Sequence, residues 1–419
     1  MIKLLSTPSQ ILTINTSGKN LKRGKDLSEV NAVDEHSIVI EDDIIKDIIP
    51  NSSVKKKSFD VVLDLDDKIV LPGLIECHTH TAFTGSRADE FRQKLDGIDY
   101  EKIAESGGGI NSTVRAVRKS SFEEIVNEVK PRIDNFIAQG ITTLEIKSGY
   151  GLDFENEIKL LQVINYLNEI YAIDIIPTFL GAHTYPPEHF NNQDEYIEII
   201  KDKMLPHIAK QRLARFCDGF CEATAFSADE IKTIFASADA NGFKLRLHTE
   251  QFNAIGGLDA ALSFNAVSVD HLEVLKEDDI KKLANSDTVA VLLPGVSFFL
   301  NYQYAPARKL IDNNVVIALA TDFNPGSSHI SSLSLIMSFA ALKMKMSIEE
   351  TINAVTINAA KVLCLNDKVG SIEIGKRADF SVFNCQEYAN IVYDIGKNLN
   401  CITMKNGDII YNSTELSFN

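Results

Sequence analysis

Two hydrophobic patterns alternate along most of this chain. Short apolar runs, typical of buried strands, are separated by longer stretches in which apolar residues recur every three or four positions, as on one face of a helix. Eight such runs follow one another, at residues 74–80, 142–147, 173–183, 216–222, 244–249, 266–271, 288–293 and 315–321. Helical periodicity separates most of them, at residues 122–138, 156–170, 228–240 and 278–283. Eight strands with crossover helices predict a (β/α)8 TIM barrel, since an open doubly wound sheet usually has about five or six strands.

The two ends of the chain carry a different pattern. Near the N-terminus, β-like runs alternate with polar stretches at residues 10–15, 37–40, 43–48 and 60–64. After a helical stretch at residues 347–363, similar runs return at residues 370–374, 379–383 and 401–404, and an Asn406-Gly407 turn follows. We therefore predict that residues 1–70 and 366–419 pair into one small β-sandwich domain beside a barrel of residues 71–365.

Composition and charge place the chain among folded soluble proteins. Hydrophobic residues make up 45% and charged residues 24%, which argues against a largely disordered chain. The formal net charge of −16 disfavours nucleic acid and membrane surfaces as partners, because both are anionic. No signal-peptide core or membrane-length apolar run is visible, and the six cysteines are scattered. These features together predict a cytoplasmic location.

Histidines gather where a barrel of this kind places its reactive side chains, at the carboxyl ends of the strands. Five of the nine histidines lie at or just beyond such ends, and an aspartate follows the last strand. These residues are His78, His80, His183, His248, His271 and Asp322. Such a distribution points to chemistry at one rim of the barrel.

Four of these residues form a candidate metal site. His78 and His80 have the i, i+2 spacing that puts both imidazoles on one face of a strand, although such a pair alone is equally consistent with two core or surface histidines. His248 and Asp322 complete a set of nitrogen and oxygen ligands that suits Zn²⁺ or Fe and leaves a position for water, whose pKa a metal lowers toward neutrality. His271 is either a fifth ligand or an acid/base group.

One metal ion per subunit is expected. Barrels with two metals usually bridge them with a modified lysine at the end of strand four, but here that strand ends at Glu222, and Lys147 lies on strand two. With one metal, His271 can polarise the substrate and Asp322 can accept a proton. Glu250 follows His248 in His-Thr-Glu-Gln and is either a further general base or an exposed loop acid.

The motifs around these residues resemble those of the metal-dependent amidohydrolase superfamily. That resemblance rests on residues 71–80 (LPGLIECHTH), His248, His271, Asp322 and residues 375–380 (GKRADF), and it covers nearly the whole chain. More specific segments are similar to the imidazolonepropionase family: residues 81–87, 106–110, 145–152, 178–183, 293–295 and 321–327. The resemblance implies a Zn or Fe enzyme of histidine degradation, a homodimer, that hydrolyses the lactam ring of 4-imidazolone-5-propanoate to N-formimidoyl-L-glutamate.

The resemblance also implies a set of substrate contacts. These are Arg87, Tyr150, His183, Gln251, Asn324, Gly326 and Ser327. The guanidinium of Arg87 suits a bidentate grip on the propanoate carboxylate. Gln251 stands where some relatives carry Glu, so we assign it substrate contact rather than proton transfer, and Ser327 replaces a Thr of some members while keeping the hydroxyl.

Two other functions fit part of the pattern. One is a deaminase or hydrolase of another nitrogen heterocycle, which would use the same metal ligands. The other is a barrel that has lost catalysis and serves as a scaffold. The complete ligand set disfavours the scaffold, because buried ligands that bind nothing cost desolvation free energy.

Overall fold

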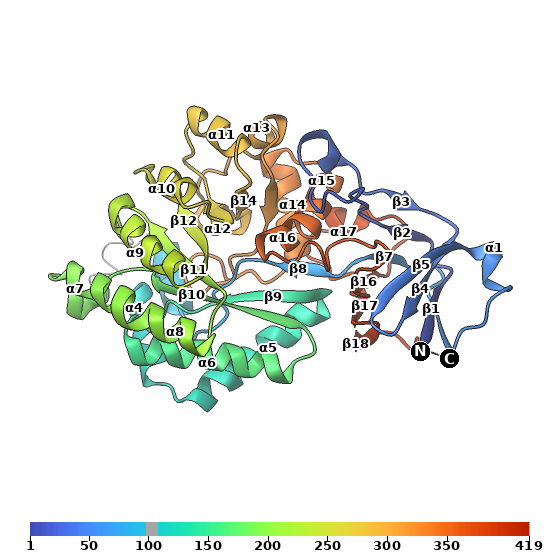
Figure 1. The fold of residues 1–419 in the computed structure, drawn as a ribbon, viewed down its shortest axis with the longest axis horizontal. Helices are drawn as coiled ribbons and strands as arrows, with labels where there is room; N and C mark the ends of the chain where they lie inside the picture. The colour runs from blue at the N-terminus through green and yellow to red at the C-terminus, as the bar shows by residue number, and fades with distance from the viewer. Residues whose placement is uncertain (98–107, 419) are drawn as a thin grey trace.

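The computed structural model describes residues 1–97 and 108–418, and its larger part is a barrel of parallel strands (Figure 1). Eight strands pair side by side in chain order: β8 (Leu74–Glu76), β9 (Ile141–Lys147), β10 (Asp174–Ala182), β11 (Phe216–Cys221), β12 (Lys244–Thr249), β13 (Ser268–His271), β14 (Val289–Leu292) and β15 (Ile317–Leu319). Each predicted apolar run coincides with one of these strands, and only β9 begins before its run, by one residue. The (β/α)8 prediction is therefore confirmed.

The first and last strands meet beyond their carboxyl ends. Thr79 and Phe323 form an isolated parallel bridge, and the His80 amide donates to the Phe323 carbonyl at 2.9 Å. The Asp322 amide donates to the His78 carbonyl at 3.1 Å. Backbone pairing thus closes the barrel at the rim where three candidate ligands lie.

The first strand is shorter than predicted, because it ends at Glu76 rather than at residue 80. The buried Glu76 carboxylate accepts hydrogen bonds from the His78 and Thr321 amides at 3.0 and 3.1 Å. A side chain therefore replaces backbone pairing at this point. His78 and His80 lie in an irregular segment past the strand, not on one face of it.

Amphipathic helices cover the outside of the barrel. Four match the predicted periodic stretches: α5 (Phe122–Ala138), α6 (Phe154–Ile170), α9 (Ala228–Ala240) and α11 (Glu277–Ala284). Ser121 and Ser227 begin α5 and α9 with capping boxes, in which the serine and a glutamate three residues later satisfy each other's backbone amides. The others are α2 (Ala88–Leu95), α4 (Ile110–Lys119), η2 (Pro187–His189), α7 (Gln193–Glu198), η3 (Ile199–Met204), α8 (Leu205–Gln211), α10 (Gly257–Ser263), α12 (Pro294–Leu300), α13 (Ala307–Asp312) and α14 (Leu333–Met344).

The helical stretch predicted at residues 347–363 is two helices, α15 (Ile348–Ala354) and α16 (Ile357–Val362). Thr356 separates them with φ −121° and ψ −97°, outside the helical region. Its hydroxyl donates to the Ile352 carbonyl at 2.6 Å and so satisfies the end of α15. The spacing of apolar residues does not reveal such a break, because both helices bury small and apolar side chains at helical spacing.

Both ends of the chain build a second body beside the barrel (Figure 1). One sheet has the order β5 (Ile44–Pro50), β4 (His36–Glu41), β1 (Ile2–Ser6) and β6 (Val61–Asp64). The other has the order β18 (Asp408–Asn412), β17 (Asn400–Lys405), β16 (Phe380–Phe383), β7 (Ile69–Pro72), β2 (Gln10–Leu12) and β3 (Ala32–Val33). Short helical turns η1 (Gly24–Ser28), α1 (Asn51–Val54) and α17 (Asn390–Tyr393) complete the chain.

The two sheets bury a shared core, which confirms the small β-sandwich. Leu5 and Leu63 of one sheet and Val70, Phe380 and Ile402 of the other belong to one fully buried cluster. N-terminal and C-terminal segments pair directly, since β7 is parallel to β2 and antiparallel to β16. Strand β7 also spans the boundary that we predict at residue 70.

The predicted strand at residues 370–374 is wrong, and β1 is a strand that the pattern did not predict. Gly370 and Gly375 have φ values of +87° and +90°, which turn the chain at both ends of that apolar run. The Ile372 amide still donates to the Thr13 carbonyl at 2.7 Å. Its apolar side chain joins the sandwich core from a loop.

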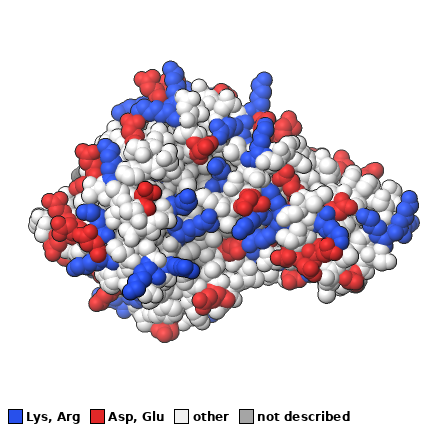
Figure 2. Space-filling model, viewed as in Figure 1, with Lys and Arg blue, Asp and Glu red and all other residues white. Residues whose placement is uncertain are grey.

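The surface agrees with the composition. Acidic and basic side chains are interspersed on the face shown in Figure 2. Within residues 1–97 and 108–418, no helix combines the length and apolar character needed to cross a membrane.

Candidate active site

A cavity of about 830 Å³ opens at the rim formed by the carboxyl ends of the barrel strands. It brings together most of the residues expected at the site from strands that are far apart in sequence. Its lining includes His80, Arg87, Tyr150, His183, His248, Gln251, His271, Asp322, Asn324, Gly326 and Ser327. Residues 106 and 107, which belong to the specific segment 106–110, lie outside the described residues.

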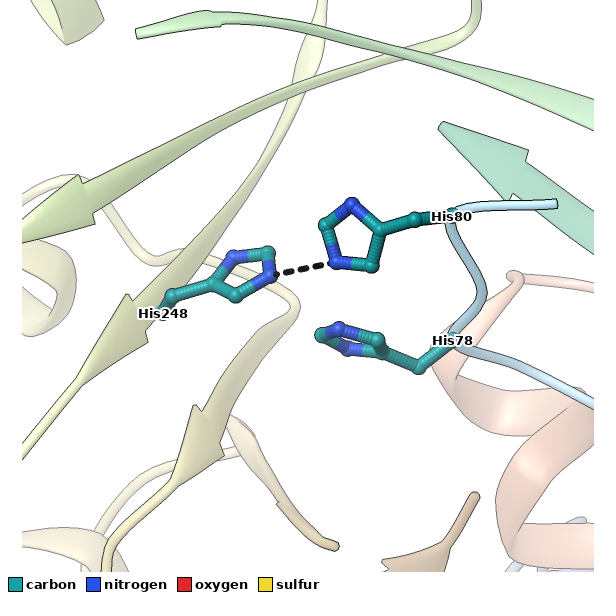
Figure 3. Close-up of side chains that lie close together, drawn as sticks. All are labelled: His78, His80 and His248. Carbon is teal, nitrogen blue, oxygen red and sulfur yellow. Dashed lines mark hydrogen bonds between the residues drawn. The ribbon is translucent and has the colours of Figure 1, made fainter. Parts of the chain in front are cut away.

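Three histidines converge at the base of this cavity (Figure 3). His78 and His80 come from the segment after β8, and His248 comes from β12. One ring nitrogen from each lies within 4.8 Å of the others, and the Nε2 atoms of His80 and His248 are 3.3 Å apart. All three side chains are buried, so water does not solvate these nitrogens freely.

Asp322 completes the group from the loop after β15. Its Oδ1 lies 3.3 Å from His78 Nε2 and 3.2 Å from His80 Nε2. Neither Asp322 Oδ1 nor His78 Nε2 makes a well-directed hydrogen bond, although both are buried. A buried polar atom without a partner costs free energy. A metal ion bound by both the carboxylate oxygen and the imidazole nitrogen would remove that cost. The donor set therefore fits a metal ion.

Two buried carboxylates fix the orientation of the histidine rings. Asp270 Oδ2 lies 2.6 Å from His78 Nδ1, and Asp218 Oδ1 lies 3.0 Å from His248 Nδ1. Donation from each Nδ1 leaves the Nε2 lone pair for a metal. Burial lowers the pKa of His248 to about 4, so its ring is neutral at pH 7 and able to bind one.

A buried lysine supports this arrangement from within the barrel. Lys147 Nζ donates to Glu145 Oε1 at 2.8 Å and to Asp218 Oδ2 at 2.9 Å. Glu145 Oε2 accepts the Thr79 amide at 2.9 Å and so holds the residue between the two histidine ligands. All three charged side chains are fully buried.

A buried arginine likewise supports Asp270, the carboxylate that contacts His78. Arg246 donates to Asp270 Oδ2 at 2.9 Å, and its Nη1 lies 3.2 Å from Glu145 Oε1. Sequence reasoning missed these supporting residues. They could have been found from charged residues at alternate positions of an otherwise apolar strand, such as Glu145 and Lys147. Alternate residues of a strand point to the same face, so these charges had to lie together inside the barrel.

His271 and His183 present ring nitrogens to the cavity. His271 ends β13 with a φ of +87°, a strained conformation for a residue with a side chain, and its Nδ1 lies 3.4 Å from Glu273 Oε1. His183 Nδ1 lies 2.9 Å from the Gly149 carbonyl and donates to it, which leaves its Nε2 as an acceptor. Burial holds the pKa of His183 well below its ordinary value, so the ring is neutral.

The loop after Asp322 is held by its own side chains. Asn324 Oδ1 accepts the Gly326 and Ser327 amides at 2.8 and 2.7 Å, and its Nδ2 donates to the Asp322 carbonyl at 2.7 Å. Asn324 therefore shapes the turn as well as lining the cavity. The Ser327 hydroxyl lies beside it.

Glu250 lies apart from this cavity, although it follows His248 by two residues. Its Oε1 accepts the Leu258 amide at 3.3 Å, and it lines a separate polar cavity with Asp259 and Asp279. The φ of +55° at Glu250 turns the chain so that the next residue, Gln251, lines the main cavity instead. The structure thus does not bring Glu250 to the candidate metal ligands.

Glu222 is a further acid at the cavity that sequence reasoning did not select. Its Oε2 accepts the Phe252 and Asn253 amides at 2.9 and 3.1 Å, which fixes the segment after Gln251. Its position at the end of the fourth predicted strand could have identified it, because the carboxyl ends of the strands form the rim of the site.

Comparison with known proteins decides the family. The amidohydrolase family matches residues 69–410. Imidazolonepropionase from Clostridium tetani is 40% identical over 412 residues, covering 97% of this chain and 98% of that protein. Imidazolonepropionase from Geobacillus thermodenitrificans is 40% identical over 409 residues, covering 96% of both. The chain belongs to the imidazolonepropionases, within the amidohydrolase family.

Solved structures match the fold of this imidazolonepropionase family member over nearly its whole length. An adenosine deaminase from Xanthomonas campestris with bound zinc covers 99% of the chain, with 94% of its own length matched, at 16% identity and a TM-score of 0.73. Atrazine chlorohydrolase from Arthrobacter aurescens complexed with zinc covers 98%, with 95% of its own length matched, at 14% identity and a TM-score of 0.66. At these identities the likeness shows a shared barrel and sandwich architecture.

Proposed function

We propose that this protein hydrolyses the ring carbon–nitrogen bond of 4-imidazolone-5-propanoate, giving N-formimidoyl-L-glutamate in cytoplasmic histidine degradation. The observation that carries the proposal is 40% identity to imidazolonepropionases along almost the entire chain. The site supports it, because the metal-ligand set lies at the base of a cavity that Arg87 also lines. The imidazolone ring of the substrate would then lie over the metal ligands, and its propanoate carboxylate would bind Arg87.

One Zn²⁺ or Fe ion per subunit is the proposed cofactor. His78, His80, His248 and Asp322 would hold it, since their donor atoms converge and a histidine and aspartate set suits both metals. When bound, such an ion supplies Lewis acidity, which lowers the pKa of a water molecule and polarises a carbonyl group.

Asp322 carries a proton from the attacking water to the substrate. As the water oxygen bonds to the ring carbonyl carbon, a carboxylate oxygen of Asp322 accepts its proton, and the same proton passes to the ring nitrogen as the carbon–nitrogen bond breaks. The imidazoles of His78 and His80 beside it outweigh burial and hold the pKa of Asp322 well below its ordinary value, so it starts ionised. His271, braced by Glu273, polarises the ring carbonyl oxygen.

The remaining cavity residues position the ring. His183 accepts a ring N–H at Nε2, because its Nδ1 already donates to Gly149. Burial raises the pKa of Tyr150, which keeps its hydroxyl protonated as a donor. Gln251 and Ser327 offer amide and hydroxyl groups to the polar edge of the substrate.

Arg87→Met is expected to raise KM for imidazolone propanoate about 10- to 100-fold, because it removes a charge-assisted hydrogen-bond pair to the carboxylate. The kcat value should stay within about threefold, since Arg87 does not touch the bond that breaks. Steady-state kinetics on the wild type and Arg87→Met measures the two effects separately. A fall in kcat with unchanged KM would contradict this role.

The proposed function is tested by following imidazolone propanoate absorbance with purified protein, together with metal content on the same sample. Loss of absorbance that stops with a chelator and returns with one equivalent of Zn²⁺ or Fe supports substrate and cofactor together. Turnover of guanine or a cytosine analogue instead, with metal fully bound, would move the assignment to another heterocycle.

We also propose that the protein is a homodimer. Helix α14 packs between α12 and α17, and each of the three exposes a large apolar side chain: Phe298, Leu342 and Tyr393 are 54%, 66% and 77% exposed. Large exposed apolar side chains on helices that pack together are typical of an interface between subunits. Sedimentation velocity is expected to give twice the chain mass, and a monomer would refute the assignment.

A further inference from the structure

The guanidinium of Arg87 is held in place before any ligand arrives. Arg87 precedes α2, and its side chain is only 9% exposed. Its Nε donates at 2.8 Å to Oε2 of Glu90, which lies three residues later in the first turn of α2. This bond leaves the two terminal nitrogens as the pair that can grip a carboxylate side by side.

Glu90 has a second bond that fixes its own position. Its Oε1 accepts the Gly109 amide at 3.1 Å, and Gly109 is the residue that precedes α4. Each carboxylate oxygen of Glu90 therefore has a different partner. The pair of bonds ties Arg87 to a second helix and limits the rotamers open to it.

Gly326 leaves the space that the guanidinium fills. A Cβ atom at Gly326 would lie 2.1 Å from Arg87 Nη1 and 2.8 Å from Cζ, both far inside contact distance. No left-handed backbone angle requires glycine at this position. Because the Asn324 side chain fixes the turn, the arginine end rather than the backbone would have to move.

We propose that Glu90 and Gly326 are positioning and specificity-determining residues, which place the Arg87 guanidinium so that the site selects ligands with a carboxylate side chain. The inference rests on the proposed function for the identity of that carboxylate. It assigns Gly326 a role through Arg87, in place of direct contact with the substrate ring. Lys94 also lines this part of the cavity, and burial and the charge of Arg87 lower its pKa.

The test measures binding, so that it does not depend on turnover. Metal-loaded wild type, Arg87→Met, Gly326→Ala and Glu90→Ala are titrated calorimetrically with imidazole-4-propanoate and with its neutral amide. Gly326→Ala is expected to weaken binding of the acid about 10- to 100-fold and to leave binding of the amide within about twofold. Adding Gly326→Ala to Arg87→Met should change nothing further, since the displaced group is then absent.

Glu90→Ala separates positioning from simple charge. Removing a carboxylate beside an anionic ligand would by charge alone tighten binding of the acid. Loss of positioning predicts the opposite, a weakening of about 5- to 20-fold that disappears in the Arg87→Met background. Glu90→Gln keeps an oxygen acceptor for Arg87 Nε but loses the acceptor for the Gly109 amide, so it should restore only part of the affinity.

Gly73→Ala is the matched control for a crowded glycine. Its added Cβ would meet the Thr142 side chain at 2.2 Å, beside the start of β8 at the opposite end of the barrel. This variant should lower the melting temperature while binding the acid as the wild type does. Calorimetric heats and melting curves on the same samples provide both readings.

Three results would overturn the proposal: equal losses for acid and amide in Gly326→Ala, tighter binding of the acid by Glu90→Ala, or a wild type that binds acid and amide alike. Failure of the proposed function looks different. In that case the preference for the acid and its dependence on Gly326 would persist, while imidazolone propanoate would not be consumed.

Discussion

Asp322→Ala is expected to lower kcat/KM for imidazolone propanoate at least about 10⁴-fold, which corresponds to more than about 5 kcal/mol of transition-state stabilisation. The substitution removes an oxygen that lies within 3.3 Å of two histidine nitrogens and also the group that accepts the proton of the attacking water. Loss of the metal ion and loss of the proton acceptor act on the same step. Kinetics and metal content measured on one preparation check the result.

Asp322→Asn separates these two contributions. An amide oxygen can still face the metal position, but the amide cannot accept a proton at neutral pH. We therefore expect Asp322→Asn to retain more metal than Asp322→Ala and to be nearly as inactive. Asp174→Ala is the control, because Asp174 pairs with Lys405 and Arg377 away from the cavity and should leave kcat/KM within about threefold. Wild-type turnover by Asp322→Ala would refute the mechanism.

The barrel and the convergence of the candidate metal ligands were predictable because both follow from local order along the chain. Strand runs and helical periodicity are local signals, and a parallel barrel brings the carboxyl ends of all strands to one rim. His248 and Asp322 could therefore be placed beside the first histidine pair without tertiary information. The pairing of the two chain ends was also visible, since each end showed β-like runs outside the alternating pattern.

What could not be predicted depends on single side-chain contacts and on backbone direction. Glu250 and Gln251 are adjacent, and only the positive φ at Glu250 decides which of them lines the cavity. Glu76 ends the first strand by accepting hydrogen bonds from two amides, one just after the first strand and one just after the last. No periodic pattern carries information of this kind.

The charged residues that support the candidate metal ligands show the same limit. Lys147 could be excluded as a bridging ligand from its strand, but its contact with Asp218 required the structure, because 71 residues separate them. That contact links Lys147 to His248 through one carboxylate. Lys147 is therefore not a candidate ligand itself, but it helps to orient one of the candidate ligands.

Lys147→Met is expected to lower the free energy of unfolding by about 3–5 kcal/mol, since it leaves two carboxylates buried without their shared cation. Lys405→Met is a matched control, because Lys405 is also buried between two carboxylates, Asp174 and Asp379, but lies at the sandwich. Both variants should lose comparable thermal stability. Only Lys147→Met should also lose metal affinity, because only its carboxylate partner holds a histidine ligand.

The pH dependence of the Lys147→Met deficit distinguishes lost charge pairing from lost packing. In the wild type, burial raises the pKa of Glu145 and Asp218, but Lys147 and Arg246 outweigh it at Glu145. His248, which contacts Asp218, and Lys147 outweigh it at Asp218, so both pKa values are held below normal. Groups with a depressed folded pKa stabilise the protein above their unfolded pKa, near 4, and lose that contribution as pH falls. Without Lys147, less positive charge remains to offset the effect of burial, so the pKa values of both carboxyl groups rise. At low pH these groups then become protonated, which removes the cost of burying their charge. Melting temperatures should therefore differ more from wild type at pH 8 than at pH 5, whereas a deficit independent of pH would mean that packing alone was lost.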